Sequence, residues 1–113
     1  MANDCLFCRI VRKEIPATIV AEDAHCIAFR DIHAQAPVHV LVIPRAHVAS
    51  LNEITDPAVV AQMYTLAAQV VKAENIADSG YRAVINTRDD GGQTVHHLHM
   101  HVLGGRRMAW PPG

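Results

Sequence analysis

The residues best able to do chemistry in this sequence lie within residues 91–105, where His97, His99 and His101 alternate with single apolar residues. In an extended chain successive side chains point to opposite faces, so the three imidazoles are predicted to share one face. Such a row can hold a metal, bind an anion or carry out proton and nucleophile chemistry. A solvated, His-rich strand face is less favoured, because histidine is neither abundant nor a preferred β-former.

A second group of reactive side chains lies near the start of the chain. Cys5 and Cys8 form a Cys-x-x-Cys pair, a spacing typical of half a zinc site or of a redox motif. The thioredoxin-like interpretation needs a preceding βαβ unit, which the residues before Cys5 do not supply. Cys26 stands in an apolar segment and is predicted to be a buried small residue. Three cysteines, an odd number, argue against a disulfide framework.

Length and composition limit the classes of protein that remain. The 113 residues fit one domain, and half of them are apolar. A formal net charge of −1 argues against nucleic acid as a partner, because no basic stripe is present to neutralise phosphates. No apolar run is long enough to span a membrane and no export signal is recognisable, so we expect a cytoplasmic protein without a membrane partner.

The elements that must position these residues are short strands and one long amphipathic helix. A short helix is predicted over residues 5–14, and the long helix begins at Asp56-Pro57, with Asp56 as N-cap, and ends near Asn75. Residues 88–92 are predicted to form a hairpin-type loop before the histidine-bearing strand. The result is an α+β domain with a mainly antiparallel sheet. Its five strands are predicted at residues 18–22, 25–30, 38–43, 81–87 and 95–103.

The pattern His-φ-His-φ-His-φ-φ over residues 97–103, with φ apolar, resembles the signature of the histidine-triad (HIT) superfamily. Gly-Gly-Gln-Thr before it, Gly-Gly-Arg-Arg after it and the final Trp-Pro-Pro-Gly are similar to the Hint branch, the histidine-triad nucleotide-binding proteins. The similarity continues through residues 12–17, 28–32, 35–39 and 42–47.

This resemblance implies a HIT-like fold in which residues 1–113 form a single HIT domain. Its mainly antiparallel five-stranded sheet, with one long and one short helix, would continue across a homodimer. The tail at residues 104–113 would dock at the dimer interface, where Trp110 would shape the partner's leaving-group pocket. A two-fold arrangement with shared site elements suits a small domain with a docked tail.

The resemblance also implies hydrolysis of purine nucleoside phosphoramidates of the AMP or GMP type. His99 would attack phosphorus and form a nucleotidyl-histidine intermediate, which is sound chemistry for a neutral imidazole. His97, His101 and His39 would complete the catalytic group, with His101 and His39 supplying proton or hydrogen-bond contacts around the phosphoryl group.

The same resemblance implies a nucleotide site. Asp31 would accept from the ribose hydroxyls, and the phosphate would be bound by Asn86, Thr94 and backbone N–H groups near Gly92. Two positions depart from the family pattern, since Thr94 replaces a usual serine and His96 a usual aromatic. The base pocket would be formed by Phe7, Ile10, Phe29, Ile32 and Leu41, which composition alone would place in the core.

Some members of the superfamily bind zinc through two cysteines and two histidines. The matching positions here are Cys5, Cys8, His47 and His97, a donor set suited to a closed structural site. We therefore expect structural zinc and no organic cofactor.

Three alternatives remain open from the sequence. The chain could be a dinucleoside polyphosphate hydrolase of the same superfamily, although the Trp-Pro-Pro-Gly ending favours the Hint branch. It could be a nucleotide-sensing interaction module whose hydrolysis is vestigial. It could also be a zinc-dependent enzyme that uses the three triad histidines as ligands, although no acidic residue stands nearby to support them.

Overall fold

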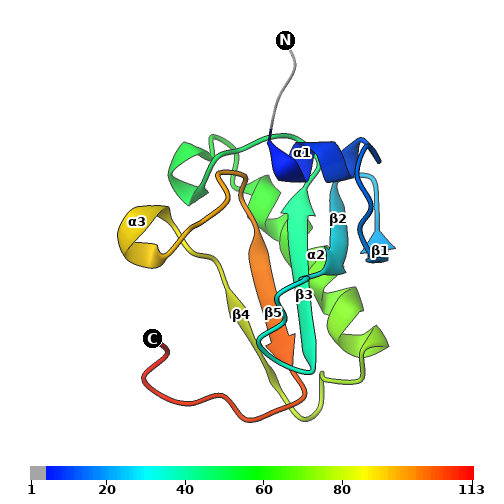
Figure 1. The fold of residues 1–113 in the computed structure, drawn as a ribbon, viewed down its shortest axis with the longest axis vertical. Coiled ribbons are helices and arrows are strands. Elements are labelled where there is room, and N and C mark those ends of the chain that lie inside the picture. The colour runs from blue at the N-terminus through cyan, green and yellow to red at the C-terminus, as the bar shows by residue number, and fades with distance from the viewer. Residues whose placement is uncertain (1–4) are drawn as a thin grey trace.

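The centre of the fold is a five-stranded antiparallel sheet with the strand order β1-β2-β3-β5-β4 (Figure 1). The computed structural model describes residues 5–113; residues 1–4, part of the predicted domain, lie outside the described residues. This architecture confirms the predicted α+β class. The strands are β1 (Ile19–Glu22), β2 (Cys26–Arg30), β3 (Val38–Pro44), β4 (Tyr81–Val84) and β5 (Met100–Gly104).

Strand β3 occupies the middle of the sheet, as its apolar, β-branched sequence predicts. It pairs with β2 on one side and with β5 on the other, where Leu41 lies opposite His101 and Val42 opposite Met100. His39, two residues before Leu41, therefore lies diagonally across from His101 on the same face of the sheet.

Helix α2 (Ala58–Ala73) covers one face of the sheet and forms the main core with it (Figure 1). Its N-cap is Pro57, one residue later than the predicted Asp56, and the Oδ1 atom of Asp56 accepts a hydrogen bond of 3.0 Å from the backbone N–H of Ala58. The helix contributes Met63, Leu66, Ala67, Val70 and Val71, and the sheet contributes Cys26, Ala28, Val40, Val42, Met100 and Val102.

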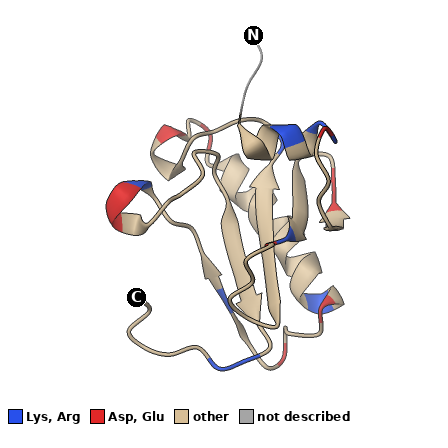
Figure 2. Ribbon diagram, viewed as in Figure 1, with Lys and Arg blue, Asp and Glu red and all other residues tan. Residues whose placement is uncertain are grey.

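The opposite face of the sheet carries a second apolar cluster beneath helix α1 (Leu6–Val11). Phe7 and Ile10 of α1 pack there on side chains of β2 and β3. Strands β3 and β5 carry no Lys, Arg, Asp or Glu, whereas the helices, the loops and each of the other three strands do (Figure 2).

The histidine-bearing strand is shorter than predicted. Strand β5 begins at Met100, so the prediction of a strand over residues 95–103 is wrong for residues 95–99. The register that sets Met100 against Val42 would set Leu98 against Pro44, which has no N–H to donate to a ladder. The N–H of Leu98 bonds instead to the carbonyl of Val48. The alternation nevertheless holds, since Leu98, like Met100, lies in the core beneath α2.

The connection before this segment also differs from the prediction. Strand β4 ends at Val84 instead of residue 87, and residues 88–92 contain a helical turn, α3 (Arg88–Gly91), instead of a hairpin-type loop. The side-chain amide oxygen of Gln93 accepts from the N–H of Arg88 at 2.9 Å and closes this turn. A 3-10 turn, η1 (Leu51–Glu53), lies in the connector before α2, so α1 is not the only short helix. Within residues 5–113 no helix is both long and apolar enough to cross a membrane.

Just after the end of β5, the backbone of Gly105 lies very close to the ring of Pro37. Gly105 has a φ of 88°, and a Cβ there would lie 2.9 Å from the Cβ of Pro37. Gly80 has a φ of 105° but open space around it. We predict that Gly80→Ala costs about 1–2 kcal/mol from backbone strain alone. Gly105→Ala should cost roughly 1 kcal/mol more, because Pro37 is rigid.

Urea denaturation of both variants measures the difference in the free energy of unfolding. Equal losses in the two variants would show that the contact with Pro37 adds no strain.

Candidate active site and metal cluster

A cavity of about 770 Å³ opens on the face of the sheet that carries α1. Its wall is apolar on the side of α1 and β2 and polar where β3 and β5 meet. Ten of the residues predicted for the nucleotide site line it: Phe7, Ile10, Phe29, Asp31, Ile32, His39, Leu41, Thr94, His99 and His101.

Four predicted site residues do not line this cavity. Asn86 and Gly92 lie outside its wall, Trp110 is 82% exposed on the tail, and the ring of His97 is fully buried elsewhere. Further residues of the wall were not predicted from the sequence, chiefly those around Ile15-Pro16, where the sequence indicates only the end of a helix. These missed residues are Leu6, Ile15, Pro16, Ala17, Arg30, His33, Gln35 and Val95.

His99 lines the cavity, and one hydrogen bond fixes its tautomer. Its Nδ1 lies 2.7 Å from the backbone carbonyl of His97, which only accepts, so Nδ1 carries the proton. In the neutral ring the lone pair therefore belongs to Nε2. The ring is held edge-on to Phe7, with the two centroids 5.2 Å apart. This arrangement fixes the tautomer of the neutral ring and leaves its lone pair on Nε2.

His101 has the opposite tautomer, because a chain of hydrogen bonds reaches it through His39. The backbone N–H of Gln35 donates to Nδ1 of His39 at 3.0 Å, so Nε2 of His39 carries the proton in the neutral ring. Nε2 of His39 lies 2.9 Å from Nδ1 of His101 and donates to it. The proton of neutral His101 is therefore on Nε2. The cavity thus receives a lone pair from His99 and an N–H from His101.

Burial keeps this histidine pair neutral at ordinary pH. Desolvation, followed by the nearby His99 and His39, lowers the pKa of His101 to about 4, against an opposing effect of Asp31. Desolvation likewise lowers the pKa of His39, again opposed by Asp31. The carboxylate Oδ2 of Asp31 lies 3.3 Å from Nε2 of His39. His39 therefore lies within hydrogen-bond distance of both Asp31 and His101, and these contacts explain why the three side chains converge.

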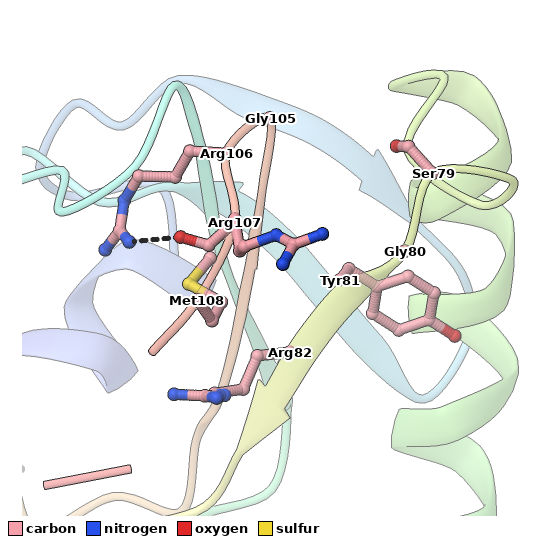
Figure 3. Close-up of a pocket in the computed structure, with 8 residues that line it drawn as sticks. All are labelled: Ser79, Gly80, Tyr81, Arg82, Gly105, Arg106, Arg107 and Met108. Carbon is pink, nitrogen blue, oxygen red and sulfur yellow. Dashed lines mark hydrogen bonds between the residues drawn. The ribbon is translucent and has the colours of Figure 1, made fainter. Parts of the chain in front are cut away.

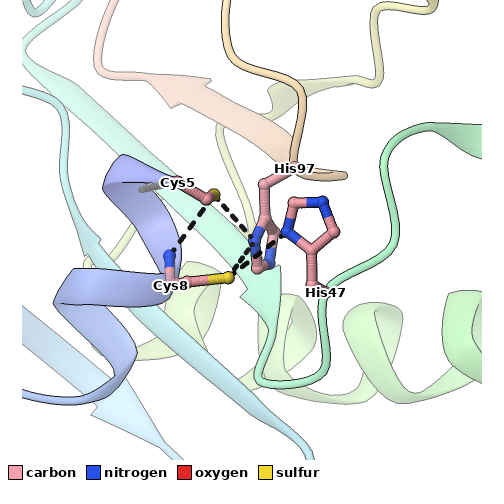
Figure 4. A group of neighbouring side chains, drawn as sticks. All are labelled: Cys5, Cys8, His47 and His97. Atoms are coloured by element: carbon pink, nitrogen blue, oxygen red, sulfur yellow. Dashed lines mark hydrogen bonds between the residues drawn. The ribbon is translucent and has the colours of Figure 1, made fainter. Parts of the chain in front are cut away.

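A cluster of two thiols and two imidazoles lies beside the cavity (Figure 4). Cys5 and Cys8 come from the start of α1, His47 from the loop after β3, and His97 from the segment before β5. Nε2 of His97 donates to the carbonyl of Pro44 at 2.9 Å, so the lone pair of its Nδ1 is directed at the two sulfur atoms. The predicted metal residues therefore converge on one point and could bind zinc.

The distances in this cluster fit zinc. The Nδ1 atom of His97 lies 3.4 Å from Sγ of Cys5 and 3.5 Å from Sγ of Cys8, and Nδ1 of His47 lies 3.3 Å from Sγ of Cys8. A tetrahedral site with zinc–sulfur bonds of about 2.3 Å and zinc–nitrogen bonds of about 2.1 Å separates sulfur from nitrogen by roughly 3.6 Å. Four protein donors would close such a site and leave no open position for substrate.

The third cysteine and the triad itself form no metal site among the described residues. Cys26 is fully buried under α2, and burial raises the pKa of its thiol to about 11, so it is the inert residue that the sequence predicts. The triad histidines do not face a common point, because His97 is directed at the cysteines and Nδ1 of His99 at a carbonyl. This geometry disfavours a metal held by all three.

A second cavity, of about 540 Å³, lies between the start of β4 and the C-terminal tail (Figure 3). Its wall includes Arg82, Arg106 and Arg107, whose guanidinium groups point in different directions. Arg82 donates to the carbonyl of Ala109 at 2.8 Å, and Arg106 donates to the carbonyl of Gln35 at 2.9 Å. Two of the three arginines thus hold backbone in place, and the group does not form a converged anion site.

The sequence profile of the HIT domain matches residues 12–108. An uncharacterised HIT-like protein of Synechococcus elongatus is 51% identical over 114 residues, with all of both chains covered. The purine nucleoside phosphoramidase of Escherichia coli K12 is 44% identical over 110 residues, which cover 96% of this chain and 92% of that protein. The chain therefore belongs to the HIT family.

Solved structures agree with this assignment. A HIT family hydrolase from Legionella pneumophila superposes with a TM-score of 0.94 at 48% identity, covering 97% of this chain and all of that one. A histidine triad nucleotide-binding protein from Candida albicans superposes with a TM-score of 0.83 at 29% identity, covering 96% of this chain and 83% of that one. The predicted HIT fold is thereby confirmed.

The lowered pKa of His101 predicts a pH dependence of stability. Histidine in an unfolded chain has a pKa of about 6.5, so between pH 6.5 and the folded value of about 4 the unfolded chain binds more protons. The free energy of unfolding should therefore fall as the pH drops through this window. In His101→Gln the slope of the unfolding free energy against pH should be smaller, by the equivalent of up to about one bound proton per chain.

Denaturant titrations at several pH values measure this slope, with the exposed His96→Gln as the matched control. A slope that is unchanged in His101→Gln would show that His101 is not held neutral by burial.

Proposed function

We propose that this protein is a HIT-family hydrolase that cleaves purine nucleoside phosphoramidates through a nucleotidyl-histidine intermediate on His99. The observation that carries the proposal is the tautomer of His99, whose Nδ1–H is engaged by the carbonyl of His97 at 2.7 Å, so that the lone pair of the neutral ring is on Nε2 of a residue that lines the cavity. The 44% identity to the E. coli purine nucleoside phosphoramidase supports the choice of substrate class.

In the first step the lone pair on Nε2 of His99 attacks phosphorus, and the phosphorus–nitrogen bond to the leaving amine breaks. The amine departs with the bonding electron pair and needs a proton, because an amide anion is a poor leaving group. His101 would supply it from Nε2. In the second step water attacks phosphorus, the bond to His99 breaks, and the nucleoside monophosphate leaves while the water's proton returns to the histidine pair.

The cavity wall supports a nucleoside as the ligand. Its apolar side would hold the purine between α1 and β2, where the exposed Ile32 lies at the rim. Asp31 would accept from the ribose hydroxyls, and Thr94 would bind a phosphate oxygen. Asn86 and the backbone near Gly92 remain predicted phosphate contacts that would act from outside the present wall. The base residues would be Phe7, Ile10, Phe29, Ile32 and Leu41.

A homodimer completes the proposal, with the sheet continued across the two-fold axis and residues 104–113 docked at the partner's site. The exposure of Trp110, at 82%, supports docking, because a large aromatic side chain is costly to leave in water and is enriched at interfaces. A cytoplasmic location remains a prediction.

Structural zinc at Cys5, Cys8, His47 and His97 is also part of the proposal. Bound there, the ion would tie the start of α1 to the loop after β3 and to the triad segment. It would supply folding free energy and take no part in the reaction.

The nucleophile is tested by brief incubation of the wild type and His99→Ala with an adenosine phosphoramidate, followed by mass spectrometry of the intact protein. We expect an adduct of the mass of AMP on the wild type alone and turnover reduced by roughly 10³-fold or more in the variant. The exposed His96→Ala is the matched control and should retain the adduct and the activity.

The other outcomes select among the alternatives. Equal turnover by wild type and His99→Ala would contradict the assignment of the nucleophile. Faster turnover of a diadenosine polyphosphate than of the phosphoramidate would favour the dinucleoside polyphosphate hydrolase. AMP binding by a wild type that is as inactive as His99→Ala on every phosphoramidate tried would favour the nucleotide-sensing module.

The metal site is tested by elemental analysis of reduced protein purified with zinc. We expect one zinc ion per chain in the wild type and in Cys26→Ser, and loss of most of the metal in Cys8→Ser. Chelation should lower the melting temperature of the wild type by about 10 °C relative to free zinc at about 100 times its dissociation constant. Equal zinc contents in Cys8→Ser and Cys26→Ser would exclude this site.

A further inference from the structure

We propose that Asp31 is a positioning residue that allows the His39–His101 pair to carry an extra proton, in addition to any contact it makes with a ribose. The kinetic part of this inference rests on the proposed function of the cavity. The effect on the two histidines does not, because it belongs to the free protein.

The carboxylate of Asp31 is fixed against His39 without any ligand. Its Oδ1 accepts from the backbone N–H of His33 at 2.8 Å, and its side chain is only 17% exposed. Its own backbone N–H donates to the carbonyl of His39 at 3.0 Å. With both its backbone and Oδ1 tethered, Asp31 holds Oδ2 at 3.3 Å from Nε2 of His39.

The position of Oδ2 of Asp31 matters when the His39–His101 pair takes up an extra proton. In the neutral pair the one proton between the rings sits on Nε2 of His39 and points at Nδ1 of His101, 2.9 Å away. Protonation of that Nδ1 would set two N–H groups against each other. Nδ1 of His39 cannot take the extra proton instead, because it already accepts the N–H of Gln35. The conflict is relieved if the N–H of His39 turns to Oδ2 of Asp31, which makes Asp31 the acceptor that the cationic pair requires.

The other charged groups around the pair do not supply this function. Arg30 is paired with Glu74 at 2.7 Å, and Arg106 is bound to the carbonyl of Gln35. His99 opposes a positive charge on His101, and His33 is exposed. Among the described residues that line the cavity, Asp31 is the only carboxylate. It works against burial, which disfavours a charge on either ring.

The consequence for the reaction is a stronger acid at the leaving group. A protonated pair donates from Nε2 of His101 to the departing amine as the phosphorus–nitrogen bond breaks, which leaves His101 neutral with its proton on Nδ1 and a lone pair on Nε2. The water that enters in the second step returns the proton. Without Asp31 the protonated pair would be less populated at any given pH, and more of the reaction would depend on donation by a neutral imidazole, a far weaker acid.

Asp31→Asn tests the idea, since asparagine keeps the size of the side chain and an oxygen for the N–H of His33. In the free protein, NMR titration of ¹⁵N-labelled imidazoles should show the midpoint for the His39–His101 pair falling by about one pH unit. The acidic limb of the kcat/KM profile should move by a similar amount. Asp23→Asn, which also keeps acceptors for two backbone N–H groups but lies in the turn before β2, should change neither.

A substrate without ribose hydroxyls separates the two roles of Asp31. With a 2′,3′-dideoxyadenosine phosphoramidate, Asp31→Asn should shift the pH profile as much as it does with the ribonucleoside. A variant that raises KM for the ribonucleoside alone and leaves the histidine titration unchanged would overturn the proposal and leave Asp31 as a ribose ligand. If the wild type hydrolysed neither substrate, the proposed function would fail, and the titration in the free protein would still decide the role of Asp31.

Discussion

The structure depends on the way His97 is held. Its ring is fully buried, with Nε2–H donated to the carbonyl of Pro44 at the end of β3 and Nδ1 directed at the two cysteines of α1. Its backbone carbonyl accepts the Nδ1–H of His99. One residue therefore joins the central strand, the group of Cys5, Cys8 and His47, and His99. The side chain of His97 serves the cluster and its backbone carbonyl serves His99, so a displacement of this residue's backbone would affect both.

This dependence is strong because the segment that carries His97 and His99 has no ladder of its own. Between α3 and Met100 the chain is held by isolated hydrogen bonds. Most of them involve the side chain of Gln93, which accepts from the N–H of Arg88 and donates to the carbonyls of Ala49 and Val95. The N–H of Leu98 reaches the carbonyl of Val48 in the same connector. The buried side chain of Gln93 thus holds this segment in place without strand pairing. The carbonyl of His97 accepts from His99.

The alternation of histidine and apolar residues was a sound guide to which side chains share a face, because an extended chain keeps a period of two even where it is unpaired. The same pattern gave the wrong strand boundary, since pairing depends on the partner and Pro44 has no N–H at the position that Leu98 would need. The resemblance to the HIT family located most of the cavity wall and all four cluster residues. It did not identify Ile15 and its neighbours as wall residues, because their position in the wall depends on the path of the chain after α1. The tautomers were equally out of reach, because they are set by the backbone of Gln35 and by one carbonyl.

Two histidines that are chemically identical and two residues apart acquire opposite properties through these backbone contacts. A carbonyl at Nδ1 makes His99 a lone-pair donor at Nε2, whereas a donor at Nδ1 makes His101 an N–H donor at Nε2. A nucleophile and a proton donor are the two groups needed to break a phosphorus–nitrogen bond in the proposed reaction. The residue types alone do not distinguish these roles. The distinction comes from which backbone groups the fold places behind each ring, and this makes the loop of Gln35 and the segment of His97 as important to the site as the histidines.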